Sequence, residues 1–133
     1  MRNIFILLIT ILCFSNTYAQ TAEQYNSKGV AKEKLEDYRG AILDYTKAIE
    51  VNPKFAEAYC NRGVVKFYLK DFRGAILDYN KAIEVDPSFG AAYFNRGETK
   101  RLLGDIDGSC LDWSKAGEFG LSEAYDKIKE YCN

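Results

Sequence analysis

Few side chains in this sequence are suited to catalysis or metal binding. The 133 residues include four cysteines and no histidine, so the commonest general base and metal ligand is missing. No glycine-rich phosphate loop, nucleophile elbow or metal-ligand spacing occurs. We therefore predict a protein that is not an enzyme, with no catalytic residue, no metal site and no cofactor. The cysteines are the remaining residues whose side-chain chemistry could matter, through disulfide formation or a reactive thiol.

The charges of the chain are nearly balanced. Lys and Arg number 18, Asp and Glu number 19, and the net charge is -1. A nucleic-acid-binding surface needs an excess of cations to neutralise phosphates, so we expect no nucleic-acid partner. Hydrophobic residues make up 47% and charged residues 28% of the chain, which is typical of one globular domain.

The first 19 residues have the layout of a secretory signal peptide. Arg2 supplies a positive charge, residues 4–14 are apolar apart from Thr10, and Ala19 is a small residue suited to cleavage. This run is too short for a membrane-spanning helix, which needs about 20 residues. We expect cleavage after Ala19, export to the periplasm or the medium, and no stable membrane insertion afterwards. A permanent anchor and a buried helix are the alternatives.

The rest of the chain contains three tandem copies of a 34-residue unit. Residues 22–55 and 56–89 are identical at 22 of 34 aligned positions, and both contain the heptapeptide RGAILDY. Residues 90–121 form a third copy, which is more divergent. In the second copy the apolar residues recur at spacings of three and four on both sides of Asp71, which predicts two helices per copy. Asp71 is placed to cap the second helix and Pro87 to end it.

A glycine recurs in the middle of each first helix, at Gly29, Gly63 and Gly97. Glycine costs about 1 kcal/mol relative to alanine in a helix interior. We therefore expect these positions to allow close approach of the partner helix, with Ala41 and Ala75 as the small partners.

The repeated residues resemble the tetratricopeptide repeat family. The anchors in the second copy are Tyr59, Gly63, Ala75, Tyr79, Ala82 and Pro87, and the first copy has the same types at the same spacing. The third copy departs from the pattern at Ser109, Trp113 and Leu121. The resemblance implies an all-α solenoid of three helix-turn-helix repeats in a single domain, residues 20–133. Residues 122–132, with Ala124, Tyr125, Ile128 and Tyr131 on one face, are predicted to form a capping helix.

Two of the cysteines are positioned to meet. If the last repeat helix and the capping helix run antiparallel about a turn near Leu121, residues equally distant from that turn lie opposite each other. Cys110 and Cys132 are each eleven positions away from it. We predict a Cys110–Cys132 disulfide, favoured by export to an oxidising compartment, with two buried thiols as the alternative. Cys60 is then unpaired, and we predict an inert residue in the groove.

By the same resemblance, a partner binds on the concave surface that the first helices of the repeats line. Its middle is apolar, and its ends carry charges such as Glu33 and Glu98. The binding residues that this projection selects are Asn26, Val30, Cys60, Val64, Phe67, Tyr68, Phe94 and Arg101. Such a groove suits a protein or peptide ligand with apolar anchors. A self-associating structural module of an envelope assembly, a homo-oligomer, is the alternative.

Two further expectations concern the polar residues of the repeats. One subset of the family grips chaperone tails with a carboxylate clamp of lysines, asparagines and an arginine, of which only Asn61 is present here. Chaperone-tail binding is therefore disfavoured. The repeated Arg62 and Arg96 are expected to bridge adjacent repeats to carboxylates such as Asp44 or Asp78, at about 0 to 1 kcal/mol each.

Overall fold

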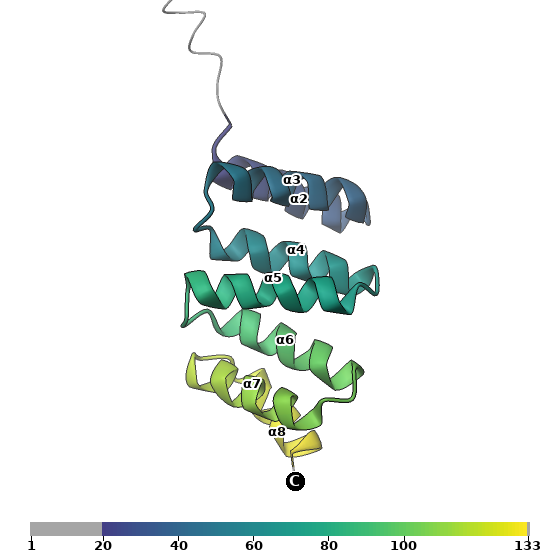
Figure 1. Cartoon of the computed structure of the whole chain (residues 1–133), viewed down its shortest axis with the longest axis vertical. Helices are drawn as coiled ribbons and strands as arrows, with labels where there is room; N and C mark the ends of the chain where they lie inside the picture. The colour runs from purple at the N-terminus through teal and green to yellow at the C-terminus, as the bar shows by residue number, and fades with distance from the viewer. Residues whose placement is uncertain (1–19, 133) are drawn as a thin grey trace, which may run out of the picture.

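A computed structural model describes residues 20–132, which form seven helices and no strand. The predicted all-α solenoid is confirmed: the helices follow one another as antiparallel layers, and the two ends of the described chain lie at opposite ends of the stack (Figure 1). The predicted signal peptide lies outside the described residues. The helices are α2 (Ala22–Lys34), α3 (Tyr38–Val51), α4 (Ala56–Tyr68), α5 (Phe72–Val85), α6 (Gly90–Leu102), α7 (Ile106–Glu118) and α8 (Glu123–Tyr131).

The starts of the second helices are fixed by aspartate caps. The backbone N–H of Gly74 donates to the side chain of Asp71 at 3.0 Å, as predicted, and Asp37 and Asp105 accept in the same way at the starts of α3 and α7. Each cap satisfies a backbone donor that a helix start leaves without a partner. The 34-residue period thus repeats the same boundary three times.

The recurring glycines do sit at the closest approach of paired helices. A Cβ on Gly63 would lie 2.7 Å from the ring of Tyr79 and 3.2 Å from the backbone oxygen of Ala75. Gly97 stands in the same relation to Trp113 and Ser109. The small partner was therefore only part of the explanation, because the aromatic ring sixteen residues ahead makes the closer contact.

The core is a series of clusters, one within each helix pair and its neighbours. Tyr45, Tyr79 and Trp113 are their largest side chains, exposed by 0%, 1% and 0%. Helix α8 covers the last cluster through Ala124, which is fully buried. No described helix is both long enough and apolar enough to cross a membrane.

Candidate functional site

A hollow of about 160 Å³ opens between the first helices of the second and third repeats. Its residues come from α4, α5 and α6: Val64, Phe67, Tyr68, Tyr79, Asn95 and Glu98. Tyr68 is the exposed part of this surface, at 55%. Phe67 is held by edge-on packing against Phe72, with ring centroids 5.4 Å apart. The site is an apolar depression with one amide and one carboxylate at its edge.

The predicted binding residues divide into two groups. Val64, Phe67 and Tyr68 line the hollow. Of the other five, Asn26 and Cys60 are buried, whereas Val30, Phe94 and Arg101 are partly exposed; Val30 packs beside Tyr45, Phe94 against the cluster of Trp113, and Arg101 beside α8. The helical projection placed Val64, Phe67 and Tyr68 on one surface, but it could not show where that surface is hollow.

Sequence reasoning missed Tyr79 and Asn95 as lining residues. Tyr79 was named only as an anchor of the repeat pattern; its ring packs in the core and also contributes to the lining of the hollow. Asn95 is the 34-residue equivalent of Asn61, so the repeat alignment carried a signal that would have found it. Its side-chain amide lies 3.7 Å from the sulfur of Cys60, as donor.

A chain of polar side chains joins the first helices on this face. The Asn61 amide donates to Asn26 Oδ1 at 3.1 Å, and the Asn26 amide donates to Glu57 Oε1 at 3.0 Å. The contacts link α2 to α4. Since the Asn61 amide is already engaged, the one residue that matches the carboxylate clamp is committed to an internal contact.

The carboxylate of Glu33 lies further along α2, near its end. It accepts a 2.7 Å hydrogen bond from the hydroxyl of Tyr45. Within residues 20–132 neither Glu33 nor Glu57 forms an ion pair. Burial, followed by the hydrogen bond to Glu33, raises the pKa of the Tyr45 phenol, and the charge of Glu57 raises it further. The first-repeat end of the groove is therefore electronegative.

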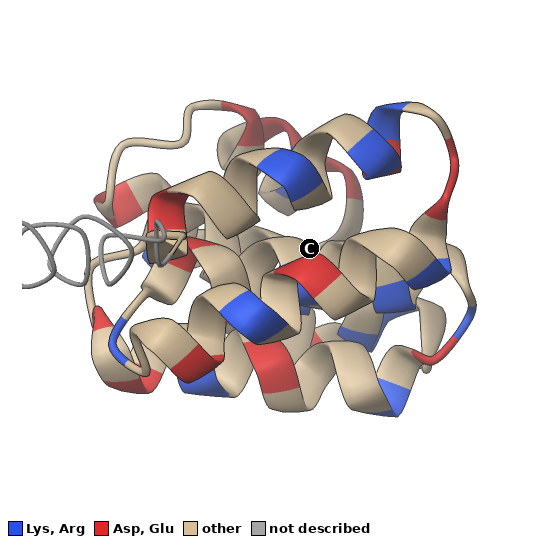
Figure 2. Cartoon of the chain, turned by 90° about the horizontal axis from the view of Figure 1, so that it is seen from above, with Lys and Arg blue, Asp and Glu red and all other residues tan. Residues whose placement is uncertain are grey.

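The opposite end of the groove carries paired charges. Glu98 lies 3.2 Å from the ammonium of Lys127 on α8 and 3.5 Å from the guanidinium of Arg101. Arg101 in turn stands over the ring of Tyr131, 5.0 Å from its centroid. These contacts tie the capping helix to α6. Seen from above, the molecule has acidic and basic segments interspersed along its helices (Figure 2).

Cys60 is a buried thiol rather than an open groove residue. It is exposed by 3%, and burial raises its pKa to about 11. The hydrogen bond from Asn95 lowers the pKa, and the charges of Glu57 and Glu33 raise it. The thiolate is the nucleophilic form. The predicted inert character of Cys60 therefore has a physical basis.

We expect iodoacetamide to alkylate Cys60 about 100-fold more slowly in the folded protein at pH 8 than in the urea-unfolded chain. With a folded pKa near 11, the thiolate fraction is small at pH 8 and rises about tenfold per pH unit up to pH 10. Peptide-level mass spectrometry over time measures both rates. Equal rates, or a folded rate that levels off near pH 9, would contradict the raised pKa.

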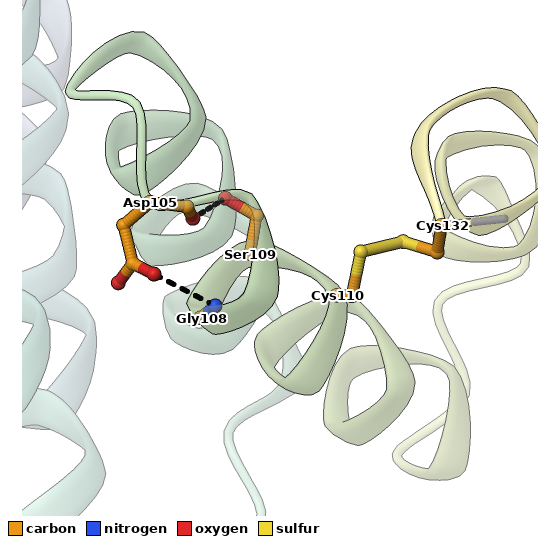
Figure 3. Close-up of a disulfide and its surroundings, with 5 residues drawn as sticks. All are labelled: Asp105, Gly108, Ser109, Cys110 and Cys132. Atoms are coloured by element: carbon orange, nitrogen blue, oxygen red, sulfur yellow. Dashed lines mark hydrogen bonds between the residues drawn. A yellow bond between two sulfur atoms is a disulfide. The ribbon is translucent and has the colours of Figure 1, made fainter.

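The other two cysteines of the described residues, Cys110 and Cys132, face each other between α7 and α8. The sulfur atoms of Cys110 and Cys132 lie 2.03 Å apart, and their Cα atoms 5.8 Å apart (Figure 3). The pairing joins residues 22 positions apart, so it would tie the C-terminal helix to the last repeat. Within residues 20–132 no cluster of Cys, Asp or Glu is arranged to hold a metal ion.

The repeated arginines require a correction. Arg62 donates to both carboxylate oxygens of Asp78, at 2.9 and 2.7 Å, within its own repeat. Its contact with the preceding repeat is to the neutral hydroxyl of Thr46, at 3.2 Å. Asp78 also accepts from Lys66 at 2.9 Å and is only 4% exposed. Arg96 repeats this pattern with Asp112. The stabilisation of about 0 to 1 kcal/mol that was expected for each ion pair applies to surface pairs. It is therefore too low for these pairs, whose carboxylates are buried.

Comparisons with known proteins agree with this geometry. A family model described as tetratricopeptide repeat matches residues 56–89, and one described as TPR repeat matches residues 31–70. No curated protein matches the chain.

Several solved structures are similar along most of the chain. The first TPR of Spaghetti (RPAP3), bound to the HSP90 peptide SRMEEVD, is 27% identical with a TM-score of 0.80, and the match covers 86% of this chain and 93% of that chain. The TPR domain of Arabidopsis OM64 is 27% identical with a TM-score of 0.76, covering 82% and 94%. The TPR2B domain of yeast Sti1, in complex with pHsp70, is 28% identical with a TM-score of 0.77, covering 83% and 92%.

Proposed function

Because the chain belongs to the tetratricopeptide repeat family, we propose that it is a non-enzymatic scaffold that binds a peptide segment of a partner protein in its concave groove. The observation that carries this proposal is the apolar hollow formed by Val64, Phe67 and Tyr68. A hollow of this size takes one apolar side chain of a ligand, and aromatic walls supply much of the buried area in such contacts. Two of the similar domains have peptide or chaperone ligands, which supports the same type of function.

The N-terminal end of the solenoid offers less to a partner than the groove does. The exposed side chains of α2 are polar, as at Glu23, Gln24, Ser27 and Lys28, and Ala22 is buried. Stacking of a second copy on this end would bury charged groups with little apolar area in return. This favours a groove ligand over self-association as the main function.

A peptide-display selection on residues 20–133 tests the proposal. The selected peptides are expected to bind the native chain and to lose at least tenfold in affinity with Tyr68→Ser, because the change removes the aromatic side chain at the mouth of the hollow without altering the charge. Leu77→Ser is the matched control, since Leu77 is 68% exposed on α5 and does not line the hollow. Peptides that bind both variants equally, or no selected peptide, would refute the groove.

We further propose that the protein works outside the cytoplasm, after cleavage following Ala19, with Cys110 and Cys132 oxidised. The arrangement of charge and apolar residues in 1–19 supports the export. The 5.8 Å separation of the two Cα atoms supports the pairing. The two proposals support each other because disulfides persist in oxidising compartments.

Loss of the disulfide is expected to lower the free energy of unfolding by about 3 kcal/mol, which is the chain-entropy estimate for a loop of this length. The double variant Cys110→Ser/Cys132→Ser, compared with the native chain in urea denaturation, measures the loss. Dithiothreitol should reduce the stability of the native chain by a similar amount and leave the variant unchanged. An equal effect of dithiothreitol on both proteins, or none on either, would show that the bond does not form.

A further inference from the structure

We propose that the ligand of this groove is a cationic peptide, in which a lysine or arginine lies two to four residues from the apolar anchor that fills the hollow. The inference rests on the proposed function and specifies the chemistry of its ligand. Its basis is the charge distribution around the hollow, together with the distance between neighbouring first helices.

Two carboxylates on the face of the first helices, Glu33 and Glu57, have no cationic partner within the described chain. Glu57 is exposed at the start of α4, and Glu33 is partly exposed near the end of α2. By the 34-residue repeat, Glu33 is the equivalent of Phe67, which lines the hollow, and Glu57 is the equivalent of Glu23. The two carboxylates therefore lie towards opposite ends of the first helices, with Glu33 at the level of the hollow, and within the described chain no ion pair neutralises either of them.

Hydrogen bonds from neutral donors hold these two carboxylates in place. Glu57 accepts from Asn26 at 3.0 Å, and Asn26 is 6% exposed. Glu33 accepts from the buried Tyr45 at 2.7 Å. Each donor is neutral, so it orients its carboxylate without cancelling the charge. A preorganised anion of this kind attracts a cationic ligand group with little loss of side-chain freedom on binding.

The two ends of the groove differ in their charges. The first-repeat end carries Glu33 and Glu57 with Glu23, and the exposed Lys34 is the cation on that part of the projected face. At the other end Arg101 and Lys127 already surround the single carboxylate Glu98. A ligand cation is therefore favoured on the side of α2, and this also sets the direction of the peptide in the groove.

The spacing within the ligand follows from the helix packing. The hollow lies between α4 and α6 at Phe67, and Glu33, the repeat equivalent of Phe67, lies on α2, one first helix further along the stack. Packed helices are about 8 to 10 Å apart, and an extended peptide advances about 3.3 Å per residue. A cation about three residues from the apolar anchor would thus reach Glu33 while the anchor fills the hollow, and the charge of Glu57 adds to the field along the same face.

The test uses the peptide-display selection on residues 20–133 and two variants with the same loss of negative charge. Glu33→Gln/Glu57→Gln retains an acceptor oxygen for Tyr45 and for Asn26 and removes both groove charges. Glu50→Gln/Glu84→Gln is the control, since these glutamates are exposed on α3 and α5. Thermal unfolding of both variants establishes that they are folded. Affinities of the selected peptides are then compared at low and high salt.

We expect selection for lysine or arginine two to four positions from an aromatic or aliphatic residue. These peptides should bind Glu33→Gln/Glu57→Gln at least fivefold more weakly at low salt and should lose most of their salt dependence, while the control variant binds as the native chain does. Selected peptides that depend on Tyr68 but carry no basic residue, or that ignore the glutamine variant, would overturn the cationic ligand and leave the groove intact. The absence of any peptide that depends on Tyr68 would overturn both.

Discussion

Replacing Asp78 by alanine is expected to lower the free energy of unfolding by about 3 kcal/mol, because the change leaves a half-buried cation without its acceptor. The side chain of Asp78 is 6% exposed and accepts from Arg62, whose side chain is 18% exposed, and from Lys66. Once Asp78 is gone, the guanidinium retains only the hydroxyl of Thr46. Urea denaturation followed by far-UV circular dichroism measures the loss.

The first repeat supplies the matched control. Asp44 is 4% exposed, as Asp78 is, but its cationic partner is Lys32, whose side chain is 42% exposed. The position equivalent to Arg62 is Lys28, which donates to Gln20 instead. Asp44→Ala should therefore cost only about 1 kcal/mol, since Lys32 can turn to water.

Removing the whole pair provides a second check. The double variant Arg62→Met/Asp78→Leu should recover at least half of the stability lost in Asp78→Ala, because it removes the more buried cation, and the ammonium of Lys66, whose side chain is 23% exposed, can turn to water. Two results would contradict this account of the buried pair. One is an equal loss of unfolding free energy in Asp78→Ala and Asp44→Ala. The other is a double variant that is less stable than Asp78→Ala.

Replacing Trp113 by alanine is expected to lower the free energy of unfolding by about 4 kcal/mol, since a large buried ring is exchanged for a cavity. Trp113 is fully buried and packs near Tyr131, with ring centroids 5.7 Å apart. It stands beside Gly97 and within the cluster that α8 covers. The cavity would lie under the capping helix, so hydrogen exchange should show α8 opening before the first two repeats.

Trp113→Tyr is the control for this prediction. Tyr45 and Tyr79 fill the equivalent positions of the other repeats beside Gly29 and Gly63, so tyrosine fits the local backbone. The cost should be about 1 kcal/mol, as measured by urea denaturation followed by circular dichroism. A cost for Trp113→Tyr as large as that for Trp113→Ala would mean that the third repeat depends on the indole itself and not on the buried volume.

The fold could be predicted from the sequence because the 34-residue unit is repeated. A helix boundary depends on local residues, and Asp71, Pro87 and Gly63 recur at their equivalents in other copies, so the same local signals were read more than once. The stacking order followed too, because consecutive short helices in a solenoid contact their neighbours. The separation of Cys110 and Cys132 from one turn was sufficient to bring them together in an antiparallel pair.

The candidate site could be predicted only as far as the helical face. Periodicity assigned Val64, Phe67 and Tyr68 to the concave side, and they line the hollow. It could not distinguish them from Phe94, which is also partly exposed but packs against the cluster of Trp113, because the shape of the surface depends on the next helix in space. The partners of the arginines could not be predicted for the same reason. The distances between the packed helices decide that Arg62 pairs with Asp78 of its own repeat.

The sequence by itself determined the number of repeats, the helix boundaries and the absence of histidine chemistry, since each is set by residue type and by spacing along the chain. Only the tertiary structure decided which polar groups are paired. It joined Asn26 to Glu57, left Glu33 and Glu57 without cations in the described chain, and buried Cys60. Pairing and desolvation depend on distances of a few ångströms between helices, and the chain fixes those distances only when the repeats pack.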